Sequence, residues 1–276
     1  LNATSVYTPS APNYTTALDF VDSTKTSVQV GSNSLFNFGK DDSFTLSAWV
    51  YSHDGGGMIF SKMQDGGTYA GYSLGLESAS QGIRVSCYIY PAFYIQTPNT
   101  SSSTFALNEW AHIAMTYDGS SNTSGVKLYV NGENIAHPDS NAITTNFNNN
   151  TAVPRISNRD GNSSNNSFDG LLSNVAVFNS ALTQSQISIL FNFGTPQSSI
   201  SFSPQGWWKL DNKTTGINNS GSLGASANGT LSTNEPTQAS TSVAVVPSWK
   251  IPTALTIPTI NYTSALKLVV IALESG

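Results

Sequence analysis

The aromatic residues best suited to hold a ligand gather in one stretch of the chain. This stretch contains five tyrosines and one phenylalanine: Tyr69, Tyr72, Tyr88, Tyr90, Phe93 and Tyr94. Aromatic faces beside Ser and Asn side chains suit sugars, whose C–H faces stack on rings and whose hydroxyls need nearby donors and acceptors. Strand alternation turns about half of such rings inward, so each ring is also a candidate for the core. We predict a glycan-binding surface formed by Tyr69, Tyr72, Tyr88, Tyr90 and Tyr94.

Paired catalytic carboxylates are not evident in the sequence. Glycoside hydrolysis needs two carboxylates about 5 to 9 Å apart across the scissile bond. The glutamates are Glu77, Glu109, Glu133, Glu235 and Glu274. They fall in separate predicted elements, and no Glu-x-Asp-x-x-Glu strand places two of them on one face. We therefore predict a protein that is not an enzyme.

Histidine and cysteine offer little further chemistry. His112 lies in a predicted strand close to Trp110, which favours a packed, hydrogen-bonded histidine over a catalytic one. Cys87 lies between Val85 and Ile89 and is expected to be a small buried residue. As the single cysteine of the chain, it excludes an intramolecular disulfide and a cysteine-based zinc site.

Composition narrows the class of protein. Only 10% of the 276 residues are charged, and the net charge is −5. About a third of the residues are Ser, Thr or Asn. The sequence contains no cluster of Lys and Arg, which argues against nucleic acid as a partner. The longest apolar run near the end, residues 268–273, is far shorter than the roughly 20 residues of a membrane-spanning helix, so no membrane insertion is expected.

Alternating apolar and polar positions predict many short strands. Residues 44–51 alternate clearly, with Phe44, Leu46, Ala48 and Val50 on one side. Further strands are expected at 28–30, 58–62, 72–77, 83–90, 110–117, 126–130, 155–157 and 172–178. The pair Asn131–Gly132 tolerates the positive φ angles of a type I′ turn and predicts a hairpin. This pattern is typical of an antiparallel sandwich.

One helix and one change of composition follow the strands. Thr183 and Gln186 fit a capping box, and Gly194 followed by Pro196 ends the predicted helix over residues 183–193. Beyond this point the chain becomes rich in Ser, Thr, Asn and Pro. We therefore divide it into a domain at 1–195 and a C-terminal extension at 196–276. The extension contains a partial repeat-opening strand at 206–231 and a Pro-rich tail. Residues 261–266 match residues 13–18 in five of six positions, which suggests a repeated unit.

Several of these segments together resemble laminin-G-like, concanavalin A-type jelly-roll domains, which occur in secreted lectins, adhesins and phage structural proteins. The matching segments are 17–20 (ALDF), 44–50 (FTLSAWV), 71–74 (GYSL), 108–119 (NEWAHIAMTYDG), 126–132 (VKLYVNG) and 168–182 (FDGLLSNVAVFNSAL). The resemblance implies an all-β, two-sheet antiparallel jelly-roll sandwich with one short helix and a C-terminal extension.

The resemblance also implies one cofactor. Members of this family often hold a calcium ion between loops through Asp and Asn oxygens. Calcium ligands are therefore expected among Asp118, Asp160 and Asp169. Asp118 and Asp169 each precede a glycine, so the interpretation we favour is that their carboxylates cap turns by accepting bonds from backbone amides and that no calcium is required. No other cofactor is expected.

The opening strand of the family is out of place in this chain. In the family it precedes the ALDF motif, whereas here the similar segment 206–211 (GWWKLD) follows the whole domain. A sheet that lacks this strand has an open edge, which invites pairing. We expect Trp207, Trp208 and Leu210 to form an assembly strand that completes this domain or a neighbouring copy, with self-complementation favoured. The apolar segment 266–273 is expected to contact a neighbouring subunit.

These observations give two main hypotheses for function. The first is a structural or recognition protein on the outside of a virion, such as a phage fibre, tail or capsid-surface component. Its partners would be copies of itself, other particle subunits or cell-surface glycans. The alternative is a carbohydrate-binding or adhesin module of a secreted bacterial protein, and a third is a degenerate glycosidase. The first two place the protein outside the cell or on the virion surface.

Overall fold

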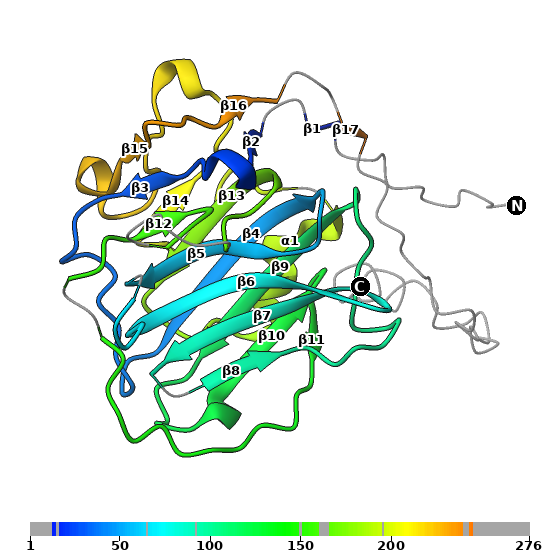
Figure 1. Cartoon of the computed structure of the whole chain (residues 1–276), viewed down its shortest axis with the longest axis vertical. Coiled ribbons are helices and arrows are strands. Elements are labelled where there is room, and N and C mark those ends of the chain that lie inside the picture. The colour runs from blue at the N-terminus through cyan, green and yellow to red at the C-terminus, as the bar shows by residue number, and fades with distance from the viewer. Residues whose placement is uncertain are drawn as a thin grey trace, which may run out of the picture.

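The computed structural model describes residues 13–14, 17–64, 66–91, 93–148, 151–159, 166–194, 196–239 and 243–244. They form an antiparallel sandwich of two large sheets (Figure 1). The prediction of an all-β, two-sheet jelly roll with one short helix is confirmed. No helix among these residues is long and apolar enough to span a membrane.

The first sheet has eight strands, seven of them in the order β11-β10-β9-β4-β13-β2-β16, while β14 also pairs with β13. Their bounds are β11 (Glu133–Ile135), β10 (Val126–Val130), β9 (Trp110–Tyr117), β4 (Phe44–Ser52), β13 (Gly170–Phe178), β2 (Leu18–Phe20), β16 (Thr237–Gln238) and β14 (Gly206–Trp208).

The second sheet has seven strands in the order β15-β3-β12-β5-β6-β7-β8. Their bounds are β15 (Gly229–Leu231), β3 (Val28–Val30), β12 (Arg155–Ile156), β5 (Gly57–Met63), β6 (Gly71–Ala79), β7 (Gly82–Tyr90) and β8 (Phe93–Gln96). A separate pair joins β1 (Asn13–Tyr14) to β17 (Val243–Ala244).

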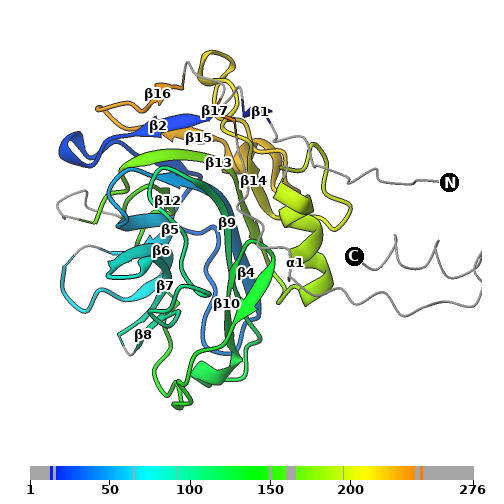
Figure 2. The same cartoon turned by 90° about the vertical axis from the view of Figure 1, so that its right-hand side faces the viewer.

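The two sheets differ in how they bury their strands. In β7 the buried Val85, Cys87 and Ile89 alternate with the partly exposed Tyr88 and Tyr90, the pattern of a sheet with one face on the core. In β9 every residue is buried, because the eight-stranded sheet is covered on both faces. Figure 2 shows the helix α1 (Gln184–Phe191) against the outer side of that sheet, whereas none of the described residues forms an α-helix on the outer side of the seven-stranded sheet.

Local signals in the sequence position the helix and one hairpin as predicted. Thr183 caps α1 in a complete capping box with Gln186, and Ile187, Leu190 and Phe191 are buried. Asn131 and Gly132 both have positive φ angles between β10 and β11, as the hairpin requires.

The C-terminal segment 206–238 lies within the two sheets. β14 pairs with residues 175–177 of β13 in the same chain, beside β2, which pairs with residues 170–172 of that strand. β15 pairs with β3, and β16 pairs with β2. Trp208 is fully buried against Phe36 and Phe60, and its Nε1 donates to the Ala227 carbonyl at 2.7 Å.

The change of composition at residue 196 is therefore not a structural boundary, since the chain returns to fill the edges of both sheets. Leu210, predicted with Trp207 and Trp208 to form the assembly strand, follows β14 and is buried in the core. The apolar tail at 266–273 lies outside the described residues.

Candidate functional site

Strand register brings polar and aromatic side chains into one row on the outer face of the seven-stranded sheet. Tyr88 of β7 lies opposite Tyr94 of β8 on one side and Ser73 of β6 on the other. Ser73 lies opposite Ser61 of β5, which lies opposite Arg155 of β12. Directly paired residues share a face of the sheet, and the neighbouring Cys87 points into the core. The row therefore faces outward.

Four tyrosine rings form a continuous series on this face, which we call the tyrosine face: Tyr69, Tyr88, Tyr90 and Tyr94. The rings of Tyr88 and Tyr94 stack with centroids 4.5 Å apart, and Tyr90 lies 5.7 Å from Tyr88. Tyr69, which is 38% exposed, meets Tyr90 edge to face at 6.2 Å. The structure therefore brings together four of the five tyrosines that the sequence singles out.

Tyr72 is the fifth, and its prediction as a glycan-binding residue is wrong. It is 1% exposed, since it lies one position out of phase with Ser73 and points between the sheets. Its ring packs 4.6 Å from that of Phe44, and its hydroxyl donates to the Phe36 carbonyl at 2.6 Å. Such a ring has no face left for a ligand.

The hydroxyls of Tyr88 and Tyr94 are neutral groups at physiological pH. Burial, with the nearby Glu77 carboxylate as a smaller cause, raises the pKa values of Tyr88 and Tyr94 above their usual range. The Tyr94 hydroxyl donates to Oε1 of Gln96 at 3.2 Å. A neutral phenol both donates and accepts hydrogen bonds, which suits a partner that carries hydroxyls.

Small residues separate these rings from Arg155. The outward positions of β6 are Gly71, Ser73 and Gly75, followed by Glu77. The Ser73 hydroxyl is buried and has no hydrogen-bond partner among the described residues. Ser61 and Ser73 are both 0% exposed, and the Ser61 hydroxyl donates to the Asn158 carbonyl at 2.7 Å, so the part of this face between Tyr88 and Arg155 is covered.

The predicted calcium ligands are not brought together. Asp118 directly follows β9 and lies near Phe44, at the start of β4. Asp169 directly precedes β13 and lies near Ser52, at the end of β4. Eight strand steps separate these ends, about 26 Å. Asp118 instead accepts a bond from the Ser120 amide at 2.9 Å, the turn-capping alternative. Asp160 lies outside the described residues.

Asp169 belongs to a group of charges that sequence reasoning did not find. Its carboxylate lies 2.9 Å from Nδ1 of His53 and accepts a bond from the Asp22 amide at 3.3 Å. Burial raises the pKa values of Asp19 and Asp22, with neighbouring carboxylates as smaller causes. Across the described part of the chain, no three His, Cys, Asp or Glu side chains lie close enough to hold a metal ion. Among the described residues, the two predicted ligands Asp118 and Asp169 therefore do not share one calcium site.

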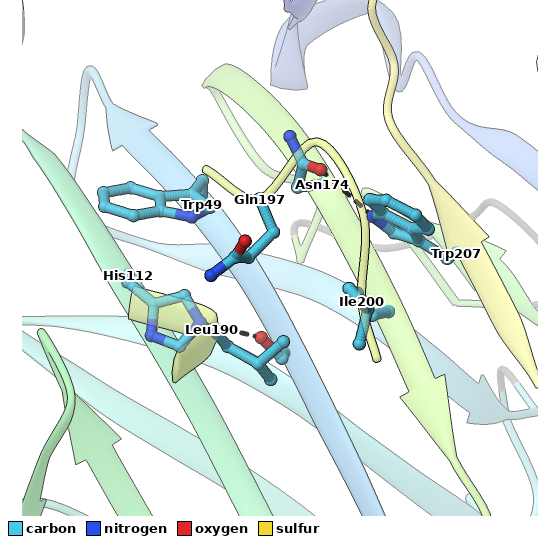
Figure 3. A pocket seen from close by; sticks show the side chains of 9 residues that line it. Trp49, His112, Asn174, Leu190, Gln197, Ile200 and Trp207 are labelled. Atoms are coloured by element: carbon cyan, nitrogen blue, oxygen red, sulfur yellow. Dashed lines mark hydrogen bonds between the residues drawn. The ribbon is translucent and has the colours of Figure 1, made fainter. Parts of the chain in front are cut away.

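His112 lies on the outer side of the eight-stranded sheet, beneath α1 and the segment that follows it (Figure 3). Its Nε2 is 2.8 Å from the Ser47 hydroxyl, and complete burial lowers its pKa to about 3, so the ring is neutral. Trp207 donates from Nε1 to Oδ1 of Asn174 at 3.0 Å beside the same cavity. The cavity measures about 10 Å³, room for about one water molecule. His112 is a packed core residue, as predicted.

Two wider hollows lie elsewhere on the surface. One, of about 310 Å³, lies beside β10 and β11 and is lined by residues such as Lys127, His137 and Asp139. The other, of about 290 Å³, is lined by residues 34–38, Asp42, Gln205 and Leu223. The first contains no Tyr, Trp or Phe, and the two rings of the second, Phe36 and Phe38, are buried in the core. Neither offers the exposed ring faces of the tyrosine face.

Comparison with known families gives one match over most of this fold. The family described as the concanavalin A-like lectin/glucanases superfamily matches residues 22–188. No curated protein matches the chain.

Solved structures match the chain at low sequence identity. A protein from Bacteroides ovatus, provisionally described as a carbohydrate binding protein, matches with a TM-score of 0.60 and 22% identity over 85% of this chain. The chain spans 62% of the length of that protein. A SAP-like pentraxin from Limulus polyphemus matches at a TM-score of 0.44 and 17% identity, over 62% of this chain and 84% of the pentraxin. A Trypanosoma rangeli sialidase matches at 0.41 and 18%, over 55% of this chain and 23% of the sialidase.

Proposed function

The chain belongs to the concanavalin A-like lectin/glucanases superfamily, and from this premise we propose that it is a carbohydrate-binding module that contacts sugar rings through the tyrosine face. The observation that supports this proposal is the series of four tyrosine rings on the outer side of the seven-stranded sheet, where no helix covers them. The provisional description of the Bacteroides ovatus protein adds an analogy at the level of the fold.

The geometry of the rings suits a sugar chain better than a single small molecule. The four rings follow one another at centroid separations between 4.5 and 6.2 Å across β7, β8 and the turn that holds Tyr69. Each partly exposed ring offers a face or an edge to the C–H groups of a sugar. Neutral tyrosine hydroxyls and the Gln96 amide supply donors and acceptors around them. Successive sugars could then lie on successive rings.

A panel of soluble polysaccharides in affinity electrophoresis tests the proposal. We expect at least one polysaccharide to slow the protein, and the double variant Tyr88→Ala, Tyr94→Ala to lose most of this retardation. Tyr51→Ala is the matched control, since Tyr51 is a half-buried tyrosine on the other sheet. Retardation that survives the double variant, or that Tyr51→Ala abolishes equally, would place binding elsewhere. A protein that no polysaccharide slows would contradict the proposal.

The setting of this recognition is a finer proposal. We place the module on the outside of a virion, in contact with glycans and with copies of itself or other particle subunits, with a carbohydrate-binding or adhesin module of a secreted bacterial protein as the alternative. Purified particles that contain the protein in many copies would support the first. A soluble monomer that is retained on sugar columns and is missing from particles would support the second.

A further inference from the structure

The strand orders of the two sheets end at β11, β16, β15 and β8, and β8 is the longest of these end strands. It has four residues, against three each in β11 and β15 and two in β16. Figure 1 shows β8 at the end of the seven-stranded sheet, next to β7. The end strand of a sheet presents unpaired backbone groups, and proteins usually protect it with charged side chains, prolines or a very short strand.

Charged side chains do not protect β8. Residues 85–108 contain no Asp, Glu, Lys, Arg or His, and Pro91 and Pro98 lie outside the strand. By contrast, the end strand β11 carries Glu133. Like charges opposite each other destabilise a pair of strands. Two copies of β8 bring no such charges together.

The hydrogen bonds between β7 and β8 determine which backbone groups of β8 point away from the sheet. The Thr97 amide donates to the Val85 carbonyl at 2.9 Å, so the backbone of Thr97 faces β7. Because this direction alternates along a strand, Ile95 also faces β7, whereas Tyr94 and Gln96 direct their N–H and C=O groups away from it. No described strand lies on that side, so the described residues leave these groups without a backbone partner.

We infer that this edge is a contact between two copies of the chain, in which β8 of one copy pairs antiparallel with β8 of the other about a two-fold axis at Ile95. This register places Tyr94 opposite Gln96 of the second copy, and Gln96 opposite Tyr94 of the second copy. Each of these pairs exchanges two backbone hydrogen bonds. The two pairs together use every outward N–H and C=O group of both β8 strands.

The side chains of β8 agree with this register. Ile95 is 1% exposed and points into the core, where it lies opposite Ile95 of the second copy. On the outer face, Tyr94 lies diagonal to Tyr94 of the second copy, a separation that aromatic side chains span. The two tyrosine faces then form one surface, on which a single polysaccharide chain can contact both copies. The inference itself does not depend on sugar binding, since it rests on backbone groups.

The contact is short, so the dimer is expected to be weak. A ladder of four residues falls short of the roughly 1,000 Å² that stable interfaces bury. Pro98 has no N–H to donate, so the ladder does not extend beyond this end of β8. Association should therefore depend on protein concentration.

Sedimentation equilibrium over a range of protein concentrations tests the inference. We expect a monomer–dimer equilibrium for the wild type. Gln96→Pro should weaken it about ten-fold or more, because proline removes the amide that donates across the contact in both copies. The fold should tolerate this change, since proline fits an edge strand at a position where the N–H points away from the sheet.

Asn134→Pro is the matched control. Asn134 lies on the end strand β11, opposite Tyr129. In a two-residue hairpin the flanking residues, here Val130 and Glu133, form the hydrogen-bonded pair, so the Asn134 amide also points away from its sheet. This variant should leave the association unchanged. If Gln96→Pro does not fold, Gln96→Lys keeps the backbone and places a charge on the β8 edge, which should also weaken the dimer.

Amide hydrogen exchange followed by NMR locates the contact. The amides of Tyr94 and Gln96 should exchange about ten-fold more slowly in concentrated than in dilute protein, because pairing protects them. The Ile95 amide already faces β7 and should not change.

The outcomes separate this inference from the proposed function. A monomer at every concentration would overturn the inference and leave the edge to a strand of another protein. A dimer that neither Gln96→Pro nor Gln96→Lys weakens, or that Asn134→Pro weakens equally, would place the contact elsewhere and overturn it as well. A dimer of the expected kind that binds no polysaccharide of the panel would overturn only the proposed function.

Discussion

The outer faces of the two sheets both carry aromatic rings, but the rings are buried on one sheet and partly exposed on the other. On the eight-stranded sheet, Trp49, Tyr129 and Trp207 lie beneath α1 and the segment that follows it and are almost fully buried. On the seven-stranded sheet, the rings of the tyrosine face stack on one another and remain partly exposed. An aromatic side chain on this fold thus becomes core or a ligand platform according to whether a later segment covers it.

The residues that cover the outer side of the eight-stranded sheet lie far along the chain, in α1 and the segment that follows it. Ile187 and Leu190 of α1 pack on Tyr129 and Ala114, and Ile200 and Phe202 pack against the same cluster. The strands beneath therefore bury both faces, as the unbroken burial of β9 shows. Among the described residues no such segment covers Tyr88 and Tyr90 of β7, which remain partly exposed, although the outward Ser86 is buried. The comparison predicts that substitutions on the two faces have opposite effects on stability and on binding.

The largest expected effect comes from removing the segments that complete the sheets. A chain that ends at residue 196 loses β14, β15 and β16 and should aggregate or fail to fold, because edges of both sheets are then open. Within the full chain, Trp208→Ala should lower the free energy of unfolding by about 3 to 5 kcal/mol in urea denaturation. A chain that ends at Ala244 keeps the described strands and is the control. A soluble, monomeric 1–196 chain with an unchanged urea midpoint would contradict the prediction.

The next largest effect comes from removing one aromatic ring from each outer face. Trp207→Ala should lower the free energy of unfolding by about 3 kcal/mol, whereas Tyr88→Ala should lower it by about 1 kcal/mol, since its ring is only half-buried. Saccharide binding should respond in the reverse order, with loss in Tyr88→Ala and retention in folded Trp207→Ala. Urea denaturation and calorimetry on the same two variants check both halves. Equal losses of unfolding free energy in the two variants would show that rings on the two faces contribute equally to stability and would contradict the comparison.

A pH effect should come from the covered face. The pKa of His112 is lowered to about 3 in the folded protein, while an unfolded histidine titrates near 6.5. Below pH 6.5 the unfolded chain therefore binds a proton that the folded chain refuses, and stability falls as the pH drops toward 3, by up to about 1.4 kcal/mol per pH unit. His112→Gln should remove this part of the slope between pH 6.5 and 4.5. An identical slope in wild type and variant would mean that His112 is accessible to protons in the fold.

The smallest expected effect concerns calcium. Asp118 and Asp169 lie at opposite ends of β4 and bond to nearby groups, so millimolar calcium and a chelator should leave the melting temperature unchanged. A ligand that binds only the folded state raises that temperature by mass action. A clear rise with calcium that Asp169→Asn abolishes would restore a metal site at this residue.

Much of the fold could be predicted from the sequence because its signals are local. Alternation gave the strand positions, Asn131–Gly132 gave a hairpin, and Thr183 with Gln186 gave the helix start. The return of residues 206–238 into both sheets depends on long-range pairing, which composition does not record. The shift to Ser, Thr and Asn at residue 196 therefore suggested a boundary that the sheets do not have.

The site was only partly predictable for the same reason. The tyrosines are close in sequence, so their clustering was visible, but the phase of Tyr72 relative to Ser73 needed the register with β5 and β7. Arg155 and Tyr88 come into one row only through the pairing of β12 with β5, of β5 with β6 and of β6 with β7. Likewise, His53 and Asp169 are 116 residues apart and come together at the ends of β4 and β13.

Mapping of the bound sugar tests the central claim, recognition at the uncovered tyrosine face, most directly. Amide chemical shifts of the protein would be recorded by NMR with and without an oligosaccharide prepared from the tightest-binding polysaccharide of the panel. The account predicts that the largest changes fall on β7 and β8 and around Tyr69, with α1 and β10 unaffected. Changes confined to the hollow beside β10 and β11, or to the cover over His112, would contradict it.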